Sequence, residues 1–286
     1  MNDGIARRFL PNWPVQSAPA FFGRKGGRRA VLTAVAALAA TSVPAHAEDS
    51  LRVGVMSGDS EVLMEHVADE AKSRGLRLQV TAFSDYLLPN EALDHGDLDA
   101  NAFQHQPYLD NQVKARGYRI VPIAYTVVAP IGLYSRKAKT AADLPQGARI
   151  GIPNDPSNGG RGLNLLAALG VIQLRDGAGI LPTPLDITAN PRGIRIVELD
   201  AGIIARSLDD LDAAVVNTDW ALKANLGLDH RIGSEAVDGN PYRNIIAVRV
   251  GSEGDLRLRT LVDAYHSDAV RQFILSYYQG RQLPAW

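Results

Sequence analysis

Residues suited to holding a small molecule gather in five short blocks, each placed where a predicted strand ends. The blocks contain an arginine, several asparagines, aromatic side chains and a histidine, and they cover residues 83–93, 96–109, 153–163, 215–220 and 240–244. Open α/β sheets bind ligands beyond the carboxyl ends of their strands. The chemistry that these blocks could carry is therefore recognition of a small ligand.

Catalytic and metal-binding motifs are not found at the required spacing. The sequence has no G-x-S-x-G elbow, no P-loop and no H-E-x-x-H motif. None of the six histidines is paired at metal-ligand spacing, and there is no cysteine. The acids Asp94, Asp97 and Asp99 are interpreted as solvated turn residues. We expect a binding protein without metal or cofactor rather than an enzyme.

The elements that would position the five blocks alternate between strand and helix, which predicts an α/β fold with largely parallel sheets. Such a chain is long for one sheet and suits two lobes. The expected strands are 51–56, 76–83, 100–103, 118–129, 149–153, 194–198, 213–217 and 244–250. The expected helices are 61–73, 89–95, 107–116, 160–169, 201–208, 220–226, 256–265 and 268–278.

Proline and glycine interrupt this alternation near residues 127–130 and 239–242, where we expect the chain to cross between lobes. The first lobe is then built from residues 48–128 plus 243–286, and the second from residues 129–242. Two facing lobes create a cleft, which is the default place for a small ligand.

The first 47 residues have the features of a cleavable export signal. Six basic residues stand against Asp3, a charge of +5, and the apolar run 30–40 and Ala45-His46-Ala47 follow. The apolar run is far shorter than the roughly 20 residues that span a bilayer. We expect cleavage after Ala47 and a soluble mature chain. Arg28-Arg29 resembles a twin-arginine signal; a permanent anchor or a structural helix is the alternative.

The rest of the chain is acidic, with 24 basic and 30 acidic residues among 239. An acidic body argues against nucleic acid or an anionic membrane as the main partner. After the leader, no further apolar stretch is long enough to insert into a membrane.

The five blocks resemble the methionine-binding proteins of bacterial ABC importers, the MetQ/NlpA lipoprotein family. The similarity runs through essentially all of residues 51–286, and its most specific string is D-A-N-A-F-Q-H-x-P-Y-L, starting at Asp99. The resemblance implies a two-lobed periplasmic binding protein fold of type II, each lobe a mixed sheet flanked by helices. It also implies capture of methionine in the interlobe cleft and delivery to an inner-membrane permease with a cytoplasmic ATPase, and we expect a monomer.

The sequence departs from the family at one point. Members usually carry a lipobox cysteine at the mature N-terminus, where this sequence has Ala47-Glu48. We therefore expect the protein to be free in the periplasm, without a lipid anchor.

The resemblance assigns residues to the polar head of the ligand. Arg161 would hold the carboxylate with two parallel hydrogen bonds, although spacing alone equally fits a surface arginine in a first helical turn. Asn217 and Asn244 would accept from the ammonium, with Asn158 and Asn164 as weaker candidates. The alternative for the asparagines is a turn or helix-cap role.

The resemblance also assigns the walls of the thioether slot. Tyr86 and Phe103 are the expected aromatic walls, with Tyr108 and Tyr125 as weaker candidates, although plain core positions are the alternative. A sulfur–aromatic contact contributes about 0.3–1.5 kcal/mol. His105 is expected near the sulfur, neutral at pH 7.

Other functions stay open on the sequence alone. The ligand could be L- or D-methionine, another small amino acid or a methionine-containing dipeptide. An exported enzyme on the same scaffold is the second hypothesis, because fold does not determine function. A sensor or adhesin that binds another protein is the third.

Overall fold

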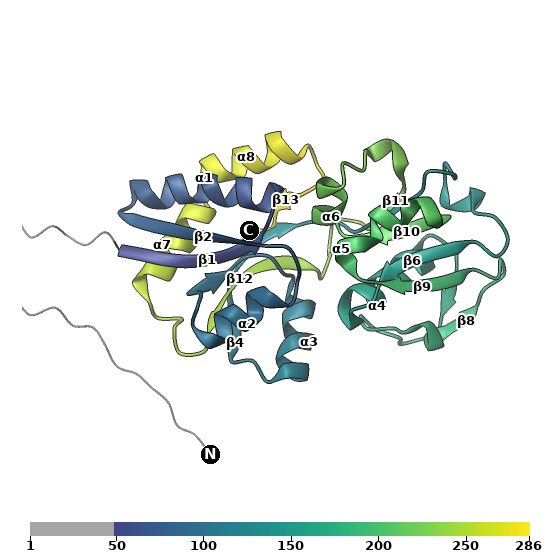
Figure 1. Ribbon diagram of the computed structural model, residues 1–286, viewed down its shortest axis with the longest axis horizontal. Helices are drawn as coiled ribbons and strands as arrows, with labels where there is room; N and C mark the ends of the chain where they lie inside the picture. The colour runs from purple at the N-terminus through teal and green to yellow at the C-terminus, as the bar shows by residue number, and fades with distance from the viewer. Residues whose placement is uncertain (1–48) are drawn as a thin grey trace, which may run out of the picture. The chain divides into compact units, whose positions relative to one another are not determined.

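The computed structural model describes residues 49–286, so the predicted export signal lies outside the described residues. Residues 49–286 form two large sheets, one in each half of Figure 1, and a separate pair of short strands. It passes from the first sheet to the second after β4 and returns at β12. No helix between residues 49 and 286 combines the length and hydropathy needed to cross a bilayer.

The first sheet has six strands in the order β13-β4-β12-β3-β1-β2. The strands β1, β2 and β3 are parallel, whereas β12 runs antiparallel to both β3 and β4, and β13 runs antiparallel to β4. The bounds are β1 Asp49–Met56, β2 Leu76–Phe83, β3 Ala100–Asn101, β4 Ile120–Val128, β12 Arg243–Arg249 and β13 Leu283–Pro284.

Helices cover both faces of the first sheet, as Figure 1 shows. α1 packs against β2, α7 and α8, while α2 and α3 lie against β4 and β12 on the other side. The apolar side chains of β1 and α1 enter one core with those of α7 and α8. The bounds are α1 Asp59–Ser73, α2 Leu88–His95, α3 Gln106–Arg116, α7 Leu256–Tyr265 and α8 Asp268–Tyr278.

The second sheet has five strands in the order β11-β5-β10-β6-β9. Its centre is parallel, and β5 and β11 are antiparallel. The strands are β5 Gly132–Tyr134, β6 Arg149–Pro153, β9 Arg195–Leu199, β10 Ala213–Val216 and β11 Arg231–Ser234. The helices are α4 Pro156–Ala168, α5 Ala201–Ile204 and α6 Thr218–Lys223, and β7 Gln173–Leu174 pairs with β8 Ile187–Ala189.

A third apolar cluster joins the two halves. It brings Met56, Phe103 and Tyr108 from the first half together with Tyr134 and Trp220 from the second. Side chains far apart in sequence therefore face each other at the junction between the sheets.

The predicted α/β architecture with two sheet-bearing lobes is confirmed, and so are the mixed sheets that the family resemblance implied; the largely parallel sheets expected from the strand–helix alternation are wrong. Both sheets are mixed, because β12 returns from the second sheet in the opposite direction and β5 and β11 form an antiparallel edge. The short strands β5, β11 and β13 are missing from the prediction, since two to four residues show no readable period.

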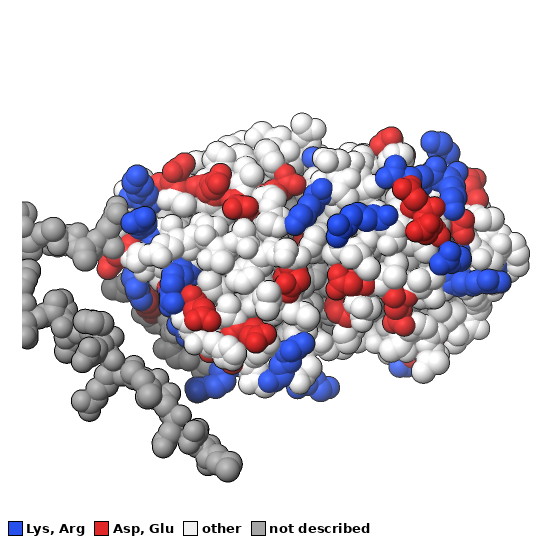
Figure 2. Space-filling view, viewed as in Figure 1, with Lys and Arg blue, Asp and Glu red and all other residues white. Residues whose placement is uncertain are grey.

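Charged side chains are interspersed on the face of the molecule seen in Figure 2, and neither sign forms a continuous surface there. A nucleic-acid interface is instead built on a basic patch or stripe.

Candidate functional site

A pocket lies at the junction of the two sheets, with about 720 Å³ of empty space including the part open to solvent. Its walls come from the turn between β3 and α3, the N-termini of α4 and α6, and the start of β12. Seven of the eight residues expected to contact a ligand line it: Tyr86, Phe103, His105, Asn158, Arg161, Asn217 and Asn244.

The turn that presents Phe103 and His105 rests on three buried amides. Asn90 donates to Gln104 Oε1 at 2.7 Å, and Asn101 donates to Asn90 Oδ1 at 2.9 Å. Gln104 in turn donates to Asn90 Oδ1 at 2.6 Å and to Asn101 Oδ1 at 3.1 Å. Buried amides need partners, and this triad supplies them. The N-A-F-Q-H string therefore encodes a support as well as a pocket wall, a role that the sequence analysis missed.

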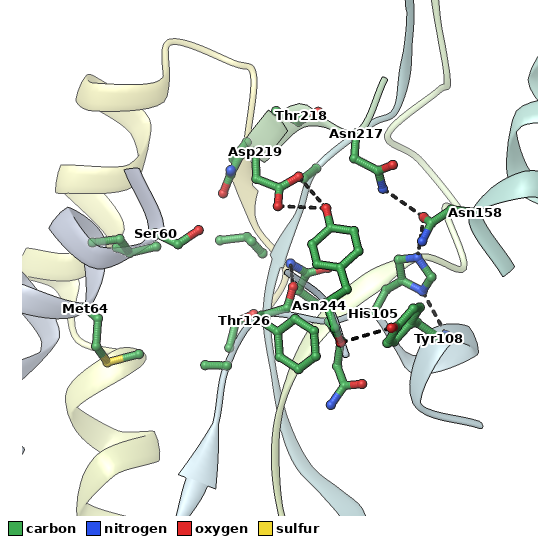
Figure 3. A pocket seen from close by; sticks show the side chains of 18 of the residues that line it. Ser60, Met64, His105, Tyr108, Thr126, Asn158, Asn217, Thr218, Asp219 and Asn244 are labelled. Carbon is green, nitrogen blue, oxygen red and sulfur yellow. Dashed lines mark hydrogen bonds between the residues drawn. The ribbon is translucent and has the colours of Figure 1, made fainter. Parts of the chain in front are cut away.

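His105 is the N-cap of α3 and is buried. Its Nδ1 accepts the Tyr108 backbone N–H at 3.1 Å, so Nε2 carries the proton and donates to Asn158 Oδ1 at 3.0 Å (Figure 3). Burial, assisted by the nearby Arg161 guanidinium, lowers the pKa of His105 to about 3. The imidazole is thus neutral at pH 7.

Helix α4 begins at Pro156, four residues earlier than predicted, and Asp155 is its N-cap. The aspartate followed by proline at the first helical position is an N-terminal signal that the sequence analysis did not use. Asp155 Oδ1 accepts the Asn158 backbone N–H at 2.9 Å, and Oδ2 accepts Asn158 Nδ2 at 2.9 Å. The cap therefore places Asn158 in the pocket wall.

Arg161 is only 3% exposed and is already paired. Its Nε donates to Glu235 Oε1 at 2.8 Å, and its Nη2 donates to Glu235 Oε2 at 2.5 Å and to the Ala129 carbonyl at 2.9 Å. The Tyr242 ring lies 4.4 Å from the guanidinium carbon. The two-bond edge that we expected to grip a carboxylate ligand holds Glu235 instead, and Nη1 makes no hydrogen bond within residues 49–286.

Asn217 and Asn244 approach the pocket from different elements. Asn217 precedes α6 and donates Nδ2 to Asn158 Oδ1 at 2.8 Å, while its own Oδ1 is buried without a partner in the described part of the chain. Asn244 is in β12. Its backbone forms an isolated antiparallel β-bridge with His105, and its side chain donates to the Phe103 carbonyl at 3.4 Å.

The aromatic wall is a cluster around Tyr86. Its ring centroid lies 6.1 Å from that of Phe103, 5.9 Å from that of Tyr108 and 5.8 Å from that of Trp220. The Tyr86 hydroxyl donates to the carboxylate of Asp219, a pocket residue that the sequence analysis missed (Figure 3). Burial raises the pKa of the Tyr86 phenol well above its usual value, so the hydroxyl keeps its proton.

Two predicted candidates lie elsewhere. Asn164 is outside the pocket lining and donates to the Gly179 carbonyl at 3.0 Å, because the third position after Arg161 faces a neighbouring loop. Tyr125 is 38% exposed and lies beneath the Arg243 guanidinium at 3.7 Å, also outside the lining. Tyr108, the other weaker candidate, does line the pocket.

The pocket is lined by groups that can recognise a ligand. Within residues 49–286, no group of three His, Asp or Glu side chains is arranged to hold a metal ion. The pocket combines one arginine that is ion-paired with Glu235, oriented amides and aromatic faces. Such a set can bind a small molecule that has both a polar head and an apolar tail.

Comparison with known proteins identifies the family. The family model described as NlpA lipoprotein matches residues 51–286. The D-methionine-binding lipoprotein MetQ of Escherichia coli K12 is 42% identical over 246 residues, which cover 82% of this chain and 88% of that protein. Outer membrane lipoprotein 1 of Mannheimia haemolytica is 39% identical over 250 residues, which cover 86% of this chain and 90% of that protein.

Solved structures show the same likeness. A nutrient binding protein from Burkholderia cenocepacia bound to methionine is 47% identical with a TM-score of 0.80, over 82% of this chain and 100% of that one. An ABC transporter periplasmic substrate-binding protein from Coxiella burnetii is 44% identical with a TM-score of 0.79, again over 82% and 100%.

Proposed function

Because the chain belongs to the NlpA lipoprotein family, we propose that it is the periplasmic solute-binding protein of an ABC importer and that methionine is its ligand. The observation that carries the proposal is the placement of complementary polar groups in one pocket. Among residues 49–286, Arg161 Nη1 and the buried Asn217 Oδ1 have no hydrogen-bond partner, so the first can donate to a ligand and the second can accept from one. Tyr86 and Phe103 supply an aromatic wall.

Each part of methionine has a partner in this arrangement. The carboxylate accepts from Arg161 Nη1, and the ammonium donates to Asn217 and Asn244. The thioether lies against Tyr86, Phe103 and the neutral His105. Hydrogen bonds to charged groups contribute about 1.5–3 kcal/mol each, and each buried methylene about 0.8 kcal/mol. Together these terms can exceed the roughly 8 kcal/mol that micromolar binding requires.

The remaining features of the proposal concern the whole protein. We assign residues 48–128 plus 243–286 to one lobe and residues 129–242 to the other, with the ligand held between them. The mature protein is exported by the leader at residues 1–47 and works in the periplasm as a monomer. It delivers its ligand to an inner-membrane permease with a cytoplasmic ATPase, and it catalyses no reaction.

Calorimetry with refolded protein tests the ligand. The protein is unfolded and refolded to remove any co-purified molecule, and it is then titrated with L-methionine, D-methionine, other small amino acids and methionine-containing dipeptides. We expect binding of methionine at micromolar concentration or tighter. Stabilisation by another solute but not by methionine would reassign the ligand. Turnover of an amide or ester would instead favour an enzyme.

A further inference from the structure

A directed chain of hydrogen bonds runs from the surface into the pocket. Asp155 Oδ2 accepts Asn158 Nδ2 at 2.9 Å. Asn158 Oδ1 then accepts Asn217 Nδ2 at 2.8 Å and His105 Nε2 at 3.0 Å, as the dashed lines in Figure 3 show for the last two. The Tyr108 backbone N–H closes the chain by donating to His105 Nδ1 at 3.1 Å.

The direction of every bond in this chain follows from its two ends. An ionised carboxylate only accepts, so Asn158 must turn its NH₂ toward Asp155 and its oxygen toward Asn217. Asn217 must then present its NH₂ to Asn158, which leaves its own oxygen without a partner among residues 49–286. At the other end a backbone N–H only donates, so His105 must carry its proton on Nε2.

We propose that Asp155, which does not line the pocket, sets the polarity of this relay and thereby makes Asn217 present an acceptor to the ligand. An acceptor at this place selects ligands with a primary ammonium group over carboxylic acids that lack one. Asp155 is a positioning residue in this scheme, since it acts through Asn158 and Asn217. The inference rests on the proposed function for the identity of the ligand, but the polarity of the relay does not.

The substitution Asp155→Asn reverses the relay while keeping the helix cap. Asp155 Oδ1 accepts the Asn158 backbone N–H and the Ser157 hydroxyl, so an asparagine must keep its oxygen there and place NH₂ where Oδ2 was. Asn158 then has to flip its amide, and Asn217 turns NH₂ rather than oxygen toward the ligand. Asparagine caps helices as well as aspartate does, so the fold is retained.

Two ligands separate this effect from a structural defect. Methionine and 4-(methylsulfanyl)butanoate share the tail and carboxylate, but only methionine has the ammonium. We expect Asp155→Asn to weaken methionine binding about 10- to 100-fold, as for the loss of a hydrogen bond to a charged group. Binding of 4-(methylsulfanyl)butanoate, followed by chemical-shift titration, should change less than about threefold on that reasoning.

The matched control is Asp255→Asn, the same change at the N-cap of α7, where the side chain accepts the Arg257 backbone N–H far from the relay. It should leave both affinities unchanged. If Asp155→Asn weakens both ligands equally, or neither, the positioning role is overturned.

A second measurement does not depend on any ligand. The ¹⁵N shifts of the His105 imidazole, assigned by their loss in His105→Asn, should report the Nε2–H tautomer in the wild type. In Asp155→Asn the Tyr108 backbone N–H still holds Nδ1, so the tautomer should stay, but the Nε2 resonance should shift because the flipped Asn158 amide no longer accepts from Nε2. An unchanged Nε2 shift would overturn the relay even if methionine binds. If the wild type does not bind methionine but the Nε2 shift changes, the relay stands and the proposed ligand falls.

Discussion

The hydroxyl of Tyr86 lies 2.7 Å from both carboxylate oxygens of Asp219, although the two residues are 133 positions apart in the sequence. Tyr86 follows β2 of the six-stranded sheet, and Asp219 is in the first turn of α6, which follows β10 of the five-stranded sheet. The contact therefore ties the two halves of the molecule together beside the pocket. Both residues line the pocket, so a ligand would sit next to this tie.

The substitution Asp219→Asn should change how stability depends on pH. Burial raises the pKa of the Asp219 carboxyl, so the folded chain binds a proton more tightly than the unfolded chain does. That contribution is complete below the unfolded pKa, near 3.9, and is lost as the pH rises through the folded pKa. We expect the free energy of unfolding of the wild type to fall relative to that of the variant over this window.

Chemical denaturation of wild type and Asp219→Asn at closely spaced pH values measures the difference directly. The pKa shifts of the other titratable groups are common to both proteins, so their contributions cancel in the comparison. Parallel stability curves from pH 3 to pH 7 would show that the Asp219 carboxyl titrates normally.

His105 should give the opposite trend. Its pKa falls from an unfolded value near 6.5 to about 3 in the folded protein. The unfolded chain therefore takes up a proton that the folded chain refuses, and stability is present above pH 6.5 and lost as the pH falls toward 3. In His105→Asn the asparagine keeps an acceptor for the N-cap of α3, so the variant should lose less stability than the wild type on acidification. Unfolding curves at pH 7, 6, 5 and 4 test this, and a constant offset between the two proteins would contradict it.

Arg161→Ala should abolish methionine binding and also destabilise the fold. The change removes the carboxylate donor and leaves Glu235, which is only 12% exposed, without its cation. Breaking a buried pair costs about 3–5 kcal/mol. Urea unfolding and calorimetric titration give the two readouts, and an unaltered affinity would move the carboxylate subsite away from Arg161.

The control for the arginine is Arg175→Ala. Arg175 also pairs with a carboxylate, Asp186, but its side chain is 55% exposed. Exposed pairs contribute about 0–1 kcal/mol, so this variant should keep nearly full stability and full binding. An equal loss of stability in both variants would show that the buried Arg161 pair contributes no more to the free energy of unfolding than the exposed Arg175 pair.

The glycines of α4 should differ in their tolerance of alanine. A Cβ at Gly159 would lie 2.7 Å from the Pro153 carbonyl oxygen, and one at Gly160 would lie 2.9 Å from the Leu181 Cα, whereas one at Gly162 meets nothing closer than 3.4 Å. We expect alanine at Gly159 or Gly160 to destabilise the fold by about 1–3 kcal/mol through overpacking.

Gly162→Ala is the matched variant in the same helix. It should be neutral or stabilising by up to about 1 kcal/mol, the gain in helix propensity. Thermal and urea unfolding of the three variants decide the matter. If all three behave alike, the close approach of α4 to its neighbours does not depend on the first two glycines.

Local patterns were enough for most of the elements. The apolar runs of β1 and β2 and the periodic faces of α7 and α8 lie within one or two residues of their predicted bounds. Such patterns can be recognised in the sequence because the burial of one face makes apolar residues recur at a regular spacing. The quoted motifs also anticipated seven residues that share one pocket.

Partnerships across long sequence distances required the folded chain. Nothing near Arg161 in the sequence indicates Glu235, 74 positions away, and nothing near Tyr86 indicates Asp219. Local patterns could not predict the direction of β12 for the same reason, since it pairs with β3 and β4 only after the chain has built the second sheet. The residue types therefore indicated which groups could recognise a ligand. Which of those groups are already occupied, and which way their amides point, depends on contacts that exist only once the two sheets meet.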